Sequence, residues 1–300
     1  MNHQDKLTEI FCEIDDFCIE FEKEITKHTL EAGKIKRRRP SQLSDSEIMT
    51  ILVLFHLGGY RCFKHFYLSY VCKHLKSEFP GLVSYNRFVE LKPKVAVPMV
   101  LFLNNRGLGS CTGISFIDST PVRVCKNKRI KRNRVFKDVA TVGKSTMGWF
   151  FGFKLHIIIN DMGEILGFAL TKGNVDDRKE EIIKDMSKNI FGKLFADKGY
   201  ISSSLFEMLF QKGIHLFTNI RRNMKNSLLT LEDKILLRKR SVIETVNDEL
   251  KNICQLEHSR HRSINNFLIN IISTITAYCF LPKKPAIKTE WLPNDQLCLY

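Results

Sequence analysis

The sequence lacks the long apolar run that a membrane-spanning helix requires. Its longest apolar stretch, Phe267 to Leu281, covers 15 residues and contains four polar side chains, whereas a spanning helix needs about 20 predominantly apolar residues. The first residues are polar and charged, which does not fit a secretory signal peptide. We therefore expect a buried C-terminal helix and a cytoplasmic protein with no membrane partner.

Metal-binding cysteine motifs are also missing. None of the nine cysteines forms a Cys-x-x-Cys pair, and their spacing fits no zinc finger or knuckle. An odd number of cysteines in a chain of this length is typical of reduced thiols. A phosphate-binding loop is excluded as well, because Gly143-Lys144-Ser145 would need a glycine where the chain has Asp138.

Acidic residues are outnumbered by basic ones. The chain has 32 Asp and Glu against 47 Lys and Arg, which gives a formal net charge of +15. This excess favours a polyanionic partner, either nucleic acid or an anionic membrane surface. A generally basic proteome or a solubility effect would give the same net charge. The positive charge is clustered, however, and clustering favours nucleic acid.

The densest cluster, which we call the basic segment, covers residues 123–137 and contains no acid. Its basic residues are Arg123, Lys126, Lys128, Arg129, Lys131, Arg132, Arg134 and Lys137. Such a segment is expected to hold DNA phosphates, with a solvated surface loop as the alternative. Smaller clusters occur at Lys34 to Arg39 and at Arg221, Arg222 and Lys225.

Residues 1–106 have the pattern of a helical domain. Apolar side chains recur at three- and four-residue steps over 5–30. Ser44-Asp45-Ser46-Glu47 is a capping box, which predicts a helix from Asp45 to Leu57. Further helices are expected near 61–76, 84–92 and 95–104. The glycine-rich stretch Arg106 to Ser110 is the expected domain boundary.

After this boundary the pattern changes to strands and helices. Strands are expected at 114–118, 148–159, 164–171, 193–197 and 214–219, and helices at 177–190, 202–212 and 236–255. This order predicts an α/β domain over 107–285, with a mixed sheet flanked by helices. Residues 286–300 would form a C-terminal tail.

Three carboxylates are the most informative residues of this second part. Asp118 and Asp197 each follow an apolar run, Ile114 to Ile117 and Leu194 to Ala196. Acids at the carboxyl ends of neighbouring strands can reach one exposed site, although either acid alone would more often belong to a turn or a helix cap. With Glu244 from a helix, they could hold two divalent metals, which clamp the attacking and leaving oxygens of a phosphodiester.

The helix that carries Glu244 presents two basic residues beside it. At about 100° per residue, Arg240, Glu244 and Lys251 fall within an arc of roughly 40°. The apolar residues Ile243, Val246 and Leu250 point to another side. An ordinary amphipathic helix with an Arg–Glu pair at i and i+4 would also give this pattern.

These residues and several short motifs resemble DDE transposases of bacterial insertion sequences, whose catalytic domain is RNase H-like. Arg240, Glu244 and Lys251 fit a signature of Tyr, two residues, Arg, three residues, Glu, six residues and Lys, with Leu237 in place of the Tyr. Other matching motifs are Phe116-Ile117-Asp118-Ser119-Thr120, Gly173-Asn174-Val175-Asp176-Asp177 and Ala196-Asp197-Lys198-Gly199-Tyr200. The stretch from Gly148 to His156 is most similar to the insertion-sequence family numbered 982.

The resemblance implies an RNase H-like α/β fold behind a helical N-terminal domain that binds DNA and dimerises. It implies that Asp118, Asp197 and Glu244 bind Mg²⁺, with Mn²⁺ as a substitute and two ions in the site. Hard carboxylate oxygens suit both metals. Asp176 or Asp177 is the alternative ligand.

The implied activity is cleavage and strand transfer of double-stranded DNA at terminal inverted repeats, by a homodimer associated with the bacterial nucleoid. Arg240, Lys251 and Lys154 would contact DNA together with the basic segment. Two alternatives remain: a metal-dependent nuclease without strand transfer, and a DNA-binding remnant without catalysis.

Overall fold

The computed structural model describes residues 3–31, 41–219, 229–257 and 261–288. It divides into two compact units. One, the helical unit, consists of Met1–Gly107 and Leu250–Leu281; the other, the sheet unit, consists of Leu108–Glu249 and Pro282–Tyr300. The small basic clusters at 34–39 and 221–225, and most of the expected C-terminal tail, lie outside the described residues.

The helical unit contains seven α-helices among its described residues. They are α1 (His3–Glu31), α2 (Asp45–Leu57), α3 (Phe63–Phe66), α4 (Cys72–His74), α5 (Tyr85–Leu91), α6 (Ala96–Phe102) and α11 (Ile264–Cys279). A π-helical turn at Tyr67–Val71 joins α3 to α4, and a 3₁₀ turn at Lys92–Val95 joins α5 to α6. All helices expected from the sequence of this part are present.

Helix α2 is the central helix of this unit. Its capping box forms as predicted: the Ser44 hydroxyl accepts from the Glu47 N–H at 3.0 Å, and the Glu47 carboxylate accepts from the Ser44 N–H at 2.7 Å. The helix covers Asp45–Leu57, and every side chain from Ser46 to His56 except Glu47 is buried on it. A helix that is apolar on all sides must be surrounded by others.

The predicted buried C-terminal helix is confirmed as α11, but it packs in the helical unit. It contacts α2 and α6, and the buried His56 ring on α2 lies with its Nδ1 2.6 Å from the Cys254 carbonyl oxygen. The sequence-based division had placed Leu250–Leu281 with the strands. Among the described residues, the structure contains no helix whose length and apolarity would let it cross a membrane.

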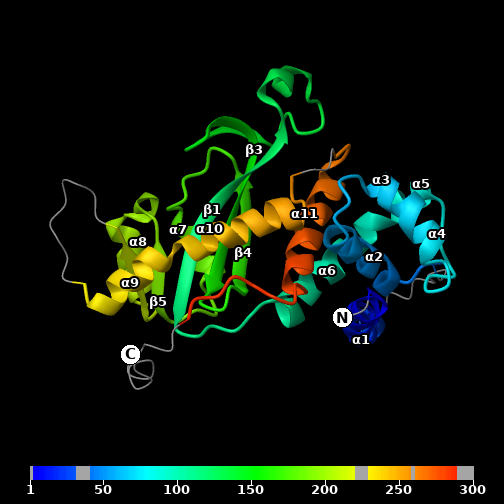
Figure 1. The fold of residues 1–300 in the computed structure, drawn as a ribbon, viewed down its shortest axis with the longest axis horizontal. Coiled ribbons are helices and arrows are strands. Elements are labelled where there is room, and N and C mark those ends of the chain that lie inside the picture. The colour runs from blue at the N-terminus through cyan, green and yellow to red at the C-terminus, as the bar shows by residue number, and fades with distance from the viewer. Residues whose placement is uncertain (1–2, 32–40, 220–228, 258–260, 289–300) are drawn as a thin grey trace. The chain divides into compact units, whose positions relative to one another are not determined.

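The sheet unit contains a six-stranded mixed sheet flanked by helices, as predicted (Figure 1). Its strands are β1 (Ile114–Cys125), β2 (Thr141–Ser145), β3 (Gly148–Asn160), β4 (Ile165–Lys172), β5 (Gly192–Ala196) and β6 (Ile214–Thr218). Its helices are α7 (Glu180–Met186), α8 (Ser203–Phe210), α9 (Leu231–Lys239) and α10 (Ser241–Asp248). The sequence had not predicted β2, and it had ended β1 too early, at Asp118.

The strand order is β2-β3-β1-β5-β6, and β4 pairs with the remaining length of β3. Strand β3 is antiparallel to β1, β2 and β4, whereas β1, β5 and β6 run parallel. The turn between β3 and β4 contains Gly163 at φ 76°, a left-handed conformation that favours glycine. This mixed order is consistent with an RNase H-like fold.

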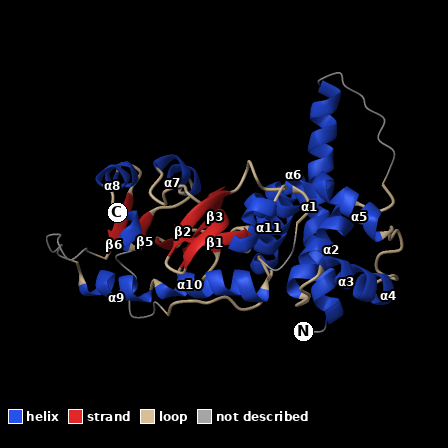
Figure 2. Cartoon of the chain, turned by 90° about the horizontal axis from the view of Figure 1, so that it is seen from above, coloured by secondary structure: helices blue, strands red, loops and turns tan. Residues whose placement is uncertain are grey.

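Helices cover both faces of the sheet. Figure 2 shows α7 and α8 on one side of the strands and α9 and α10 along the other. On the first face, Ile117, Leu194 and Ala196 pack into an apolar cluster with residues of α7 and α8. On the second face, the rings of Phe116, Phe195 and Phe217 stack across β1, β5 and β6, at centroid distances of 5.5 and 5.1 Å.

Candidate functional site

Asp118 and Asp197 occupy equivalent places on neighbouring strands. The parallel pairing of β1 and β5 ends at Phe116 and Phe195, and each aspartate comes two residues later. Side chains two residues apart in an extended chain point to the same face. Both carboxylates therefore lie on the face of the stacked phenylalanines, which α10 covers. Asp118 is not at the end of its strand as expected, but it lies where the β1–β5 pairing stops.

Helix α10 brings polar side chains to these acids. Arg240, which directly precedes α10, lies 3.1 Å from the Glu244 carboxylate and 3.9 Å from the Asp197 carboxylate. One turn further along, the Asn247 amide donates to the Asp118 carboxylate at 3.1 Å. The helix therefore joins all three acids of the predicted triad through one guanidinium and one amide.

The three acids differ in exposure. The side chains of Asp197 and Glu244 are 54% and 59% exposed, whereas Asp118 is half-buried. Burial raises the pKa of Asp118 to about 6, an effect that the nearby Glu244 and Asp197 charges increase and Arg240 reduces. Burial also raises the pKa of Tyr200, which follows Asp197 by three residues. A buried anion in this position favours a bound cation.

The donor set suits a hard divalent cation. It consists of three carboxylates and the buried Oδ1 of Asn247, which has no hydrogen-bond partner among the described residues, and oxygen ligands of this kind are preferred by Mg²⁺, Mn²⁺ and Ca²⁺. In the present conformation, no three His, Cys, Asp or Glu side chains of the described ranges lie close enough to hold one ion. The Arg240 guanidinium supplies positive charge next to Asp197 and Glu244 instead.

The sequence had not identified Asn247 as part of this site, although a signal was present. Arg240, Glu244 and Asn247 follow one another at intervals of four and three residues, which places them on one face of a helix. Lys251, the third residue of the predicted stripe, lies in a π-helical turn at Glu249–Ile253, within the helical unit from Leu250 onward. The π turn changes the angular step per residue, so the helical-wheel argument does not extend to Lys251.

Lys154 and the two alternative acids are engaged elsewhere. The Lys154 ammonium donates to the Asp177 carboxylate and to the Val175 carbonyl, both at 2.9 Å, and is 14% exposed. Asp176 pairs with Arg178 at 2.6 Å, and the hydrogen bonds from Arg178 lower its pKa to about 2. In the β1–β3 register Lys154 also points to the face opposite Asp118.

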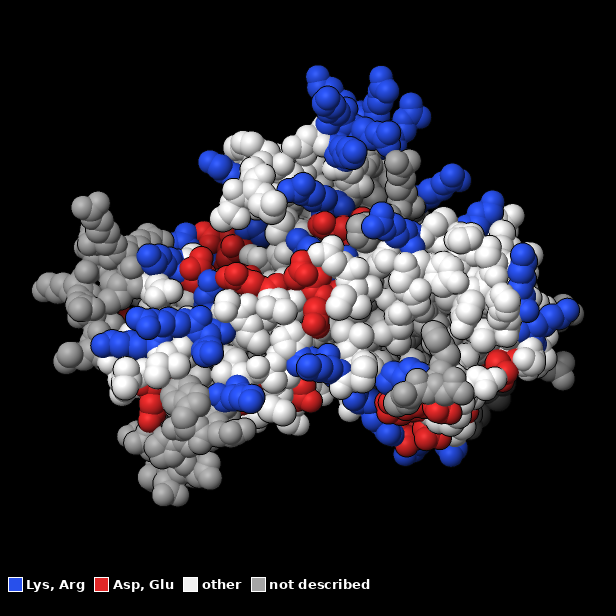
Figure 3. All heavy atoms as spheres, in the orientation of Figure 1, with Lys and Arg blue, Asp and Glu red and all other residues white. Residues whose placement is uncertain are grey.

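The basic segment projects from the sheet unit between β1 and β2. It includes a 3₁₀ turn at Asn127–Arg132, and Figure 3 shows Lys and Arg side chains gathered on this projection. The basic residues from Lys126 to Lys137 are all exposed. In the described part of the chain, no carboxylate pairs with them. Their charge is therefore available to an external polyanion.

Comparison with known proteins gives a match to one family. The family described as "Transposase DDE domain" matches residues 108–264, a stretch that contains Asp118, Asp197, Glu244 and the basic segment. Among curated proteins, none matches the sequence. Because the family match covers more than half of the chain, the protein belongs to the transposases with a DDE domain.

Proposed function

We propose that this transposase binds the terminal inverted repeats of its own element and catalyses cleavage and strand transfer, with Asp118, Asp197 and Glu244 as the metal ligands. One observation carries the assignment of the triad: two aspartates at equivalent positions of parallel strands share a face with a glutamate of the covering helix. Divalent metal ions are general in this family.

Each residue of the site has a distinct task in this proposal. The exposed carboxylates of Asp197 and Glu244 would hold the metal in place of the Arg240 guanidinium, and the half-buried Asp118 carboxylate is held in orientation by the Asn247 amide. Two Mg²⁺ ions, or Mn²⁺ in their place, would activate the attacking oxygen and stabilise the leaving oxygen. Once released, Arg240 can pair with a DNA phosphate, as Lys251 can at its own position.

The basic segment supplies the electrostatic part of DNA binding. Seven exposed cations, none of which pairs with a carboxylate in the described ranges, can neutralise several phosphates, and the release of counterions then drives association. Phosphate contacts fix register and orientation without reading sequence. In this proposal the helical unit therefore recognises the terminal repeats. A homodimer joins the two ends of the element. We also propose that the protein is a member of the insertion-sequence family numbered 982, because the stretch from Gly148 to His156 resembles that family.

The experiment is cleavage of a labelled linear duplex that carries the element's own end, in Mg²⁺ or Mn²⁺. Wild type is compared with Asp118→Asn, Asp197→Asn and Glu244→Gln. The matched control is Asp185→Asn, an exposed acid on α7 that pairs with Lys188 at 3.0 Å. We expect nicks at the element boundary that are lost in the three triad variants and kept in the control, with DNA binding intact in all. Cleavage that persists in chelator would exclude the metal mechanism.

A second assay separates strand transfer from simple hydrolysis. A pre-cut end with a free 3′-hydroxyl is incubated with a supercoiled target, and joined products are counted. Integration products exclude the nuclease that only cuts, whereas hydrolysis without joining under the same conditions contradicts the transfer step. Light scattering of the protein with and without the DNA end tests the homodimer directly.

A further inference from the structure

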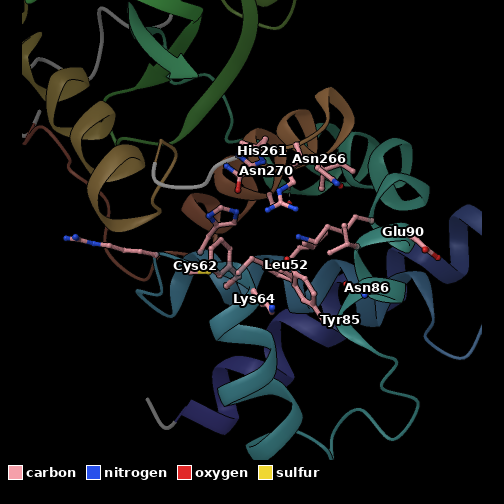
Figure 4. A pocket seen from close by; sticks show the side chains of 18 residues that line it. Leu52, Cys62, Lys64, Tyr85, Asn86, Glu90, His261, Asn266 and Asn270 are labelled. Atoms are coloured by element: carbon pink, nitrogen blue, oxygen red, sulfur yellow. Dashed lines mark hydrogen bonds between the residues drawn. The ribbon is translucent and has the colours of Figure 1, made fainter. Parts of the chain in front are cut away.

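The helical unit contains a cavity that the catalytic proposal does not use. Its volume is about 820 Å³, within the range of roughly 300–1,000 Å³ that is typical of small-ligand sites. The walls come from α2, α3, α5, α11 and the 3₁₀ turn after α5. In Figure 4, the labelled side chains of Tyr85 and Lys64 lie across the opening from His261, Asn266 and Asn270. All of these residues belong to one compact unit.

Positive charge gathers around this cavity. Four of the lining residues are Arg or Lys residues from four different segments: Arg61, Lys64, Lys92 and Arg262. The lining histidines His56 and His261 are uncharged at neutral pH, because burial lowers their pKa values to about 3 and about 4. The one acid of the described lining, Glu90, is exposed, is paired with Arg87 at 2.8 Å and projects away from the cavity in Figure 4. An excess of cations around a concave surface attracts an anion.

Lys92 is the innermost of these cations. Its ammonium lies 3.2 Å from the centroid of the Phe63 ring, a cation–π contact that offsets part of the cost of burial. No carboxylate within the described ranges pairs with it. Burial lowers the pKa of Lys92 to about 7, because the charged form loses hydration that nothing in the cavity replaces. A bound anion would stabilise the charged ammonium in place of the lost water.

The remaining walls offer groups that suit a nucleobase. The Oδ1 of Asn266 is buried and, among the described residues, has no hydrogen-bond partner. The Asn270 amide makes a long bond of 3.4 Å to the Leu256 carbonyl. The rings of Phe63 and Tyr85 stand beside each other at a centroid distance of 6.4 Å. Aromatic faces stack on unpaired bases, and amide groups bind base edges.

We propose that this cavity binds a single unpaired nucleotide of the DNA substrate, with its phosphate toward Lys92 and Arg262 and its base toward Tyr85 and Asn266. The identity of the ligand as DNA rests on the proposed function. The lining of the cavity fits a molecule that carries both an anionic group and a flat ring with hydrogen-bonding edges. An extended duplex does not fit, since its bases are stacked and paired inside the helix.

The first test uses the unaltered full-length protein. Trace acetic anhydride at pH 7.5 labels amines according to their free-base fraction, and mass spectrometry then compares Lys92 with Lys94, an exposed lysine of the same 3₁₀ turn. Thymidine 5′-monophosphate and a short single-stranded oligonucleotide should each slow labelling of Lys92 at least fivefold and leave Lys94 unchanged. No protection by either overturns the proposal. Equal protection by inorganic phosphate also overturns it, because the site would then take an anion alone.

The second test measures affinity for a single-stranded oligonucleotide by calorimetry. Lys92→Met should weaken binding about tenfold or more, the range for a lost charge-assisted hydrogen bond in a desolvated site. The matched control Lys94→Met should change it less than twofold. Asn266→Leu, with its melting temperature checked, provides a second variant at the opposite wall. If Lys92→Met and Lys94→Met bind the oligonucleotide with equal affinity, the proposal that the cavity binds a nucleotide is refuted.

The two proposals fail in different ways. Cleavage by the triad and binding of duplex through the basic segment depend on other residues, so both can persist when the cavity variants have no effect. Conversely, the mononucleotide experiment reports on the cavity even if the protein cuts no DNA.

Discussion

Arg240 is the residue on which the state of the catalytic site depends. Its guanidinium lies 3.1 Å from Glu244 and 3.9 Å from Asp197, and the side chain is only 15% exposed. A positive charge in this position stabilises two carboxylates that would otherwise repel each other, and it competes with any divalent cation. The site therefore has one arrangement held by Arg240 and another that metal would favour.

Replacing Arg240 with Gln should strengthen metal binding in the absence of DNA. Without the competing charge, we expect the affinity for Mn²⁺ to rise about three- to tenfold, equivalent to roughly 1 kcal/mol, while the affinity for DNA falls. Titration calorimetry with Mn²⁺ measures the first effect and a gel shift the second. Arg238→Gln, an exposed arginine on the preceding helix, is the control. Unchanged or weaker Mn²⁺ binding in Arg240→Gln would contradict the competition.

Asp118 should destabilise the metal-free protein at neutral pH. Burial raises its folded-state pKa to about 6, above the value of about 3.9 expected in the unfolded chain. A group with a raised carboxyl pKa stabilises the fold in acid, and that contribution disappears as the pH rises from about 4 through 6. At pH 7 the ionised carboxylate is therefore a net cost, of about 1–2 kcal/mol after allowance for its partial exposure.

Asp118→Asn should then raise the melting temperature of the metal-free protein by about 2–6 °C at pH 7. The amide keeps the contact with Asn247 and removes the buried charge. In the same variant, Mg²⁺ should no longer raise the melting temperature. Glu244→Gln, at an exposed acid, serves as the comparison and should not stabilise the protein. A lower melting temperature for Asp118→Asn would show that the ionised Asp118 carboxylate does not destabilise the fold.

The basic segment acts as an element, through its summed charge. Changing Lys128, Arg129, Lys131 and Arg132 to Gln should reduce the slope of log affinity against log salt by about 3–4, since each phosphate contact contributes about 0.9. Affinity for random and terminal-repeat DNA should fall alike. The control changes four exposed lysines near α7 and α8, namely Lys179, Lys184, Lys188 and Lys212. An unchanged salt slope in the first variant would remove the segment from the DNA interface.

The elements also show how far sequence can predict this structure. The helix at roughly Asp45 to Leu57 was predicted and is confirmed, because a capping box and an apolar run are local signals. Strand β1 was predicted too short, because Asp118 was taken as a strand end, although β1 continues as an antiparallel partner of β3 to Cys125. That pairing is non-local, so no feature of residues 114–125 alone reveals it.

The long helix expected at 236–255 shows a second limit. In the structure it is three segments, α9, α10 and a π-helical turn. The sequence does not indicate this break, because no glycine or proline interrupts residues 236–255. The structure places the three acids of the predicted triad on β1, directly after β5 and on α10, and their role as metal ligands stays a prediction. Asn247 was missed because its amide carries no charge.

At the scale of the whole molecule, buried histidines couple both units to pH. In the helical unit, burial lowers the pKa of His56 to about 3 and that of His261 to about 4. In the sheet unit, burial lowers the pKa of His156 to about 4. Each value lies below the value of about 6.5 expected for an unfolded chain. The unfolded protein therefore binds more protons between about pH 4 and 6.5, and both units lose stability as the pH falls through this window.

The expected cost is a few kcal/mol per unit, with the larger loss in the helical unit because it has two such histidines. Hydrogen exchange read by mass spectrometry resolves the units separately, which a single melting temperature of a two-unit protein does not. From pH 7.5 to 5, exchange in α2 and α11 should accelerate more than exchange in β1 and β5, after correction for the intrinsic rate. His56→Gln keeps a donor for the Cys254 carbonyl and should weaken this pH dependence. The exposed His65→Gln should leave it unchanged, and an equal response of both variants would locate the acid sensitivity elsewhere.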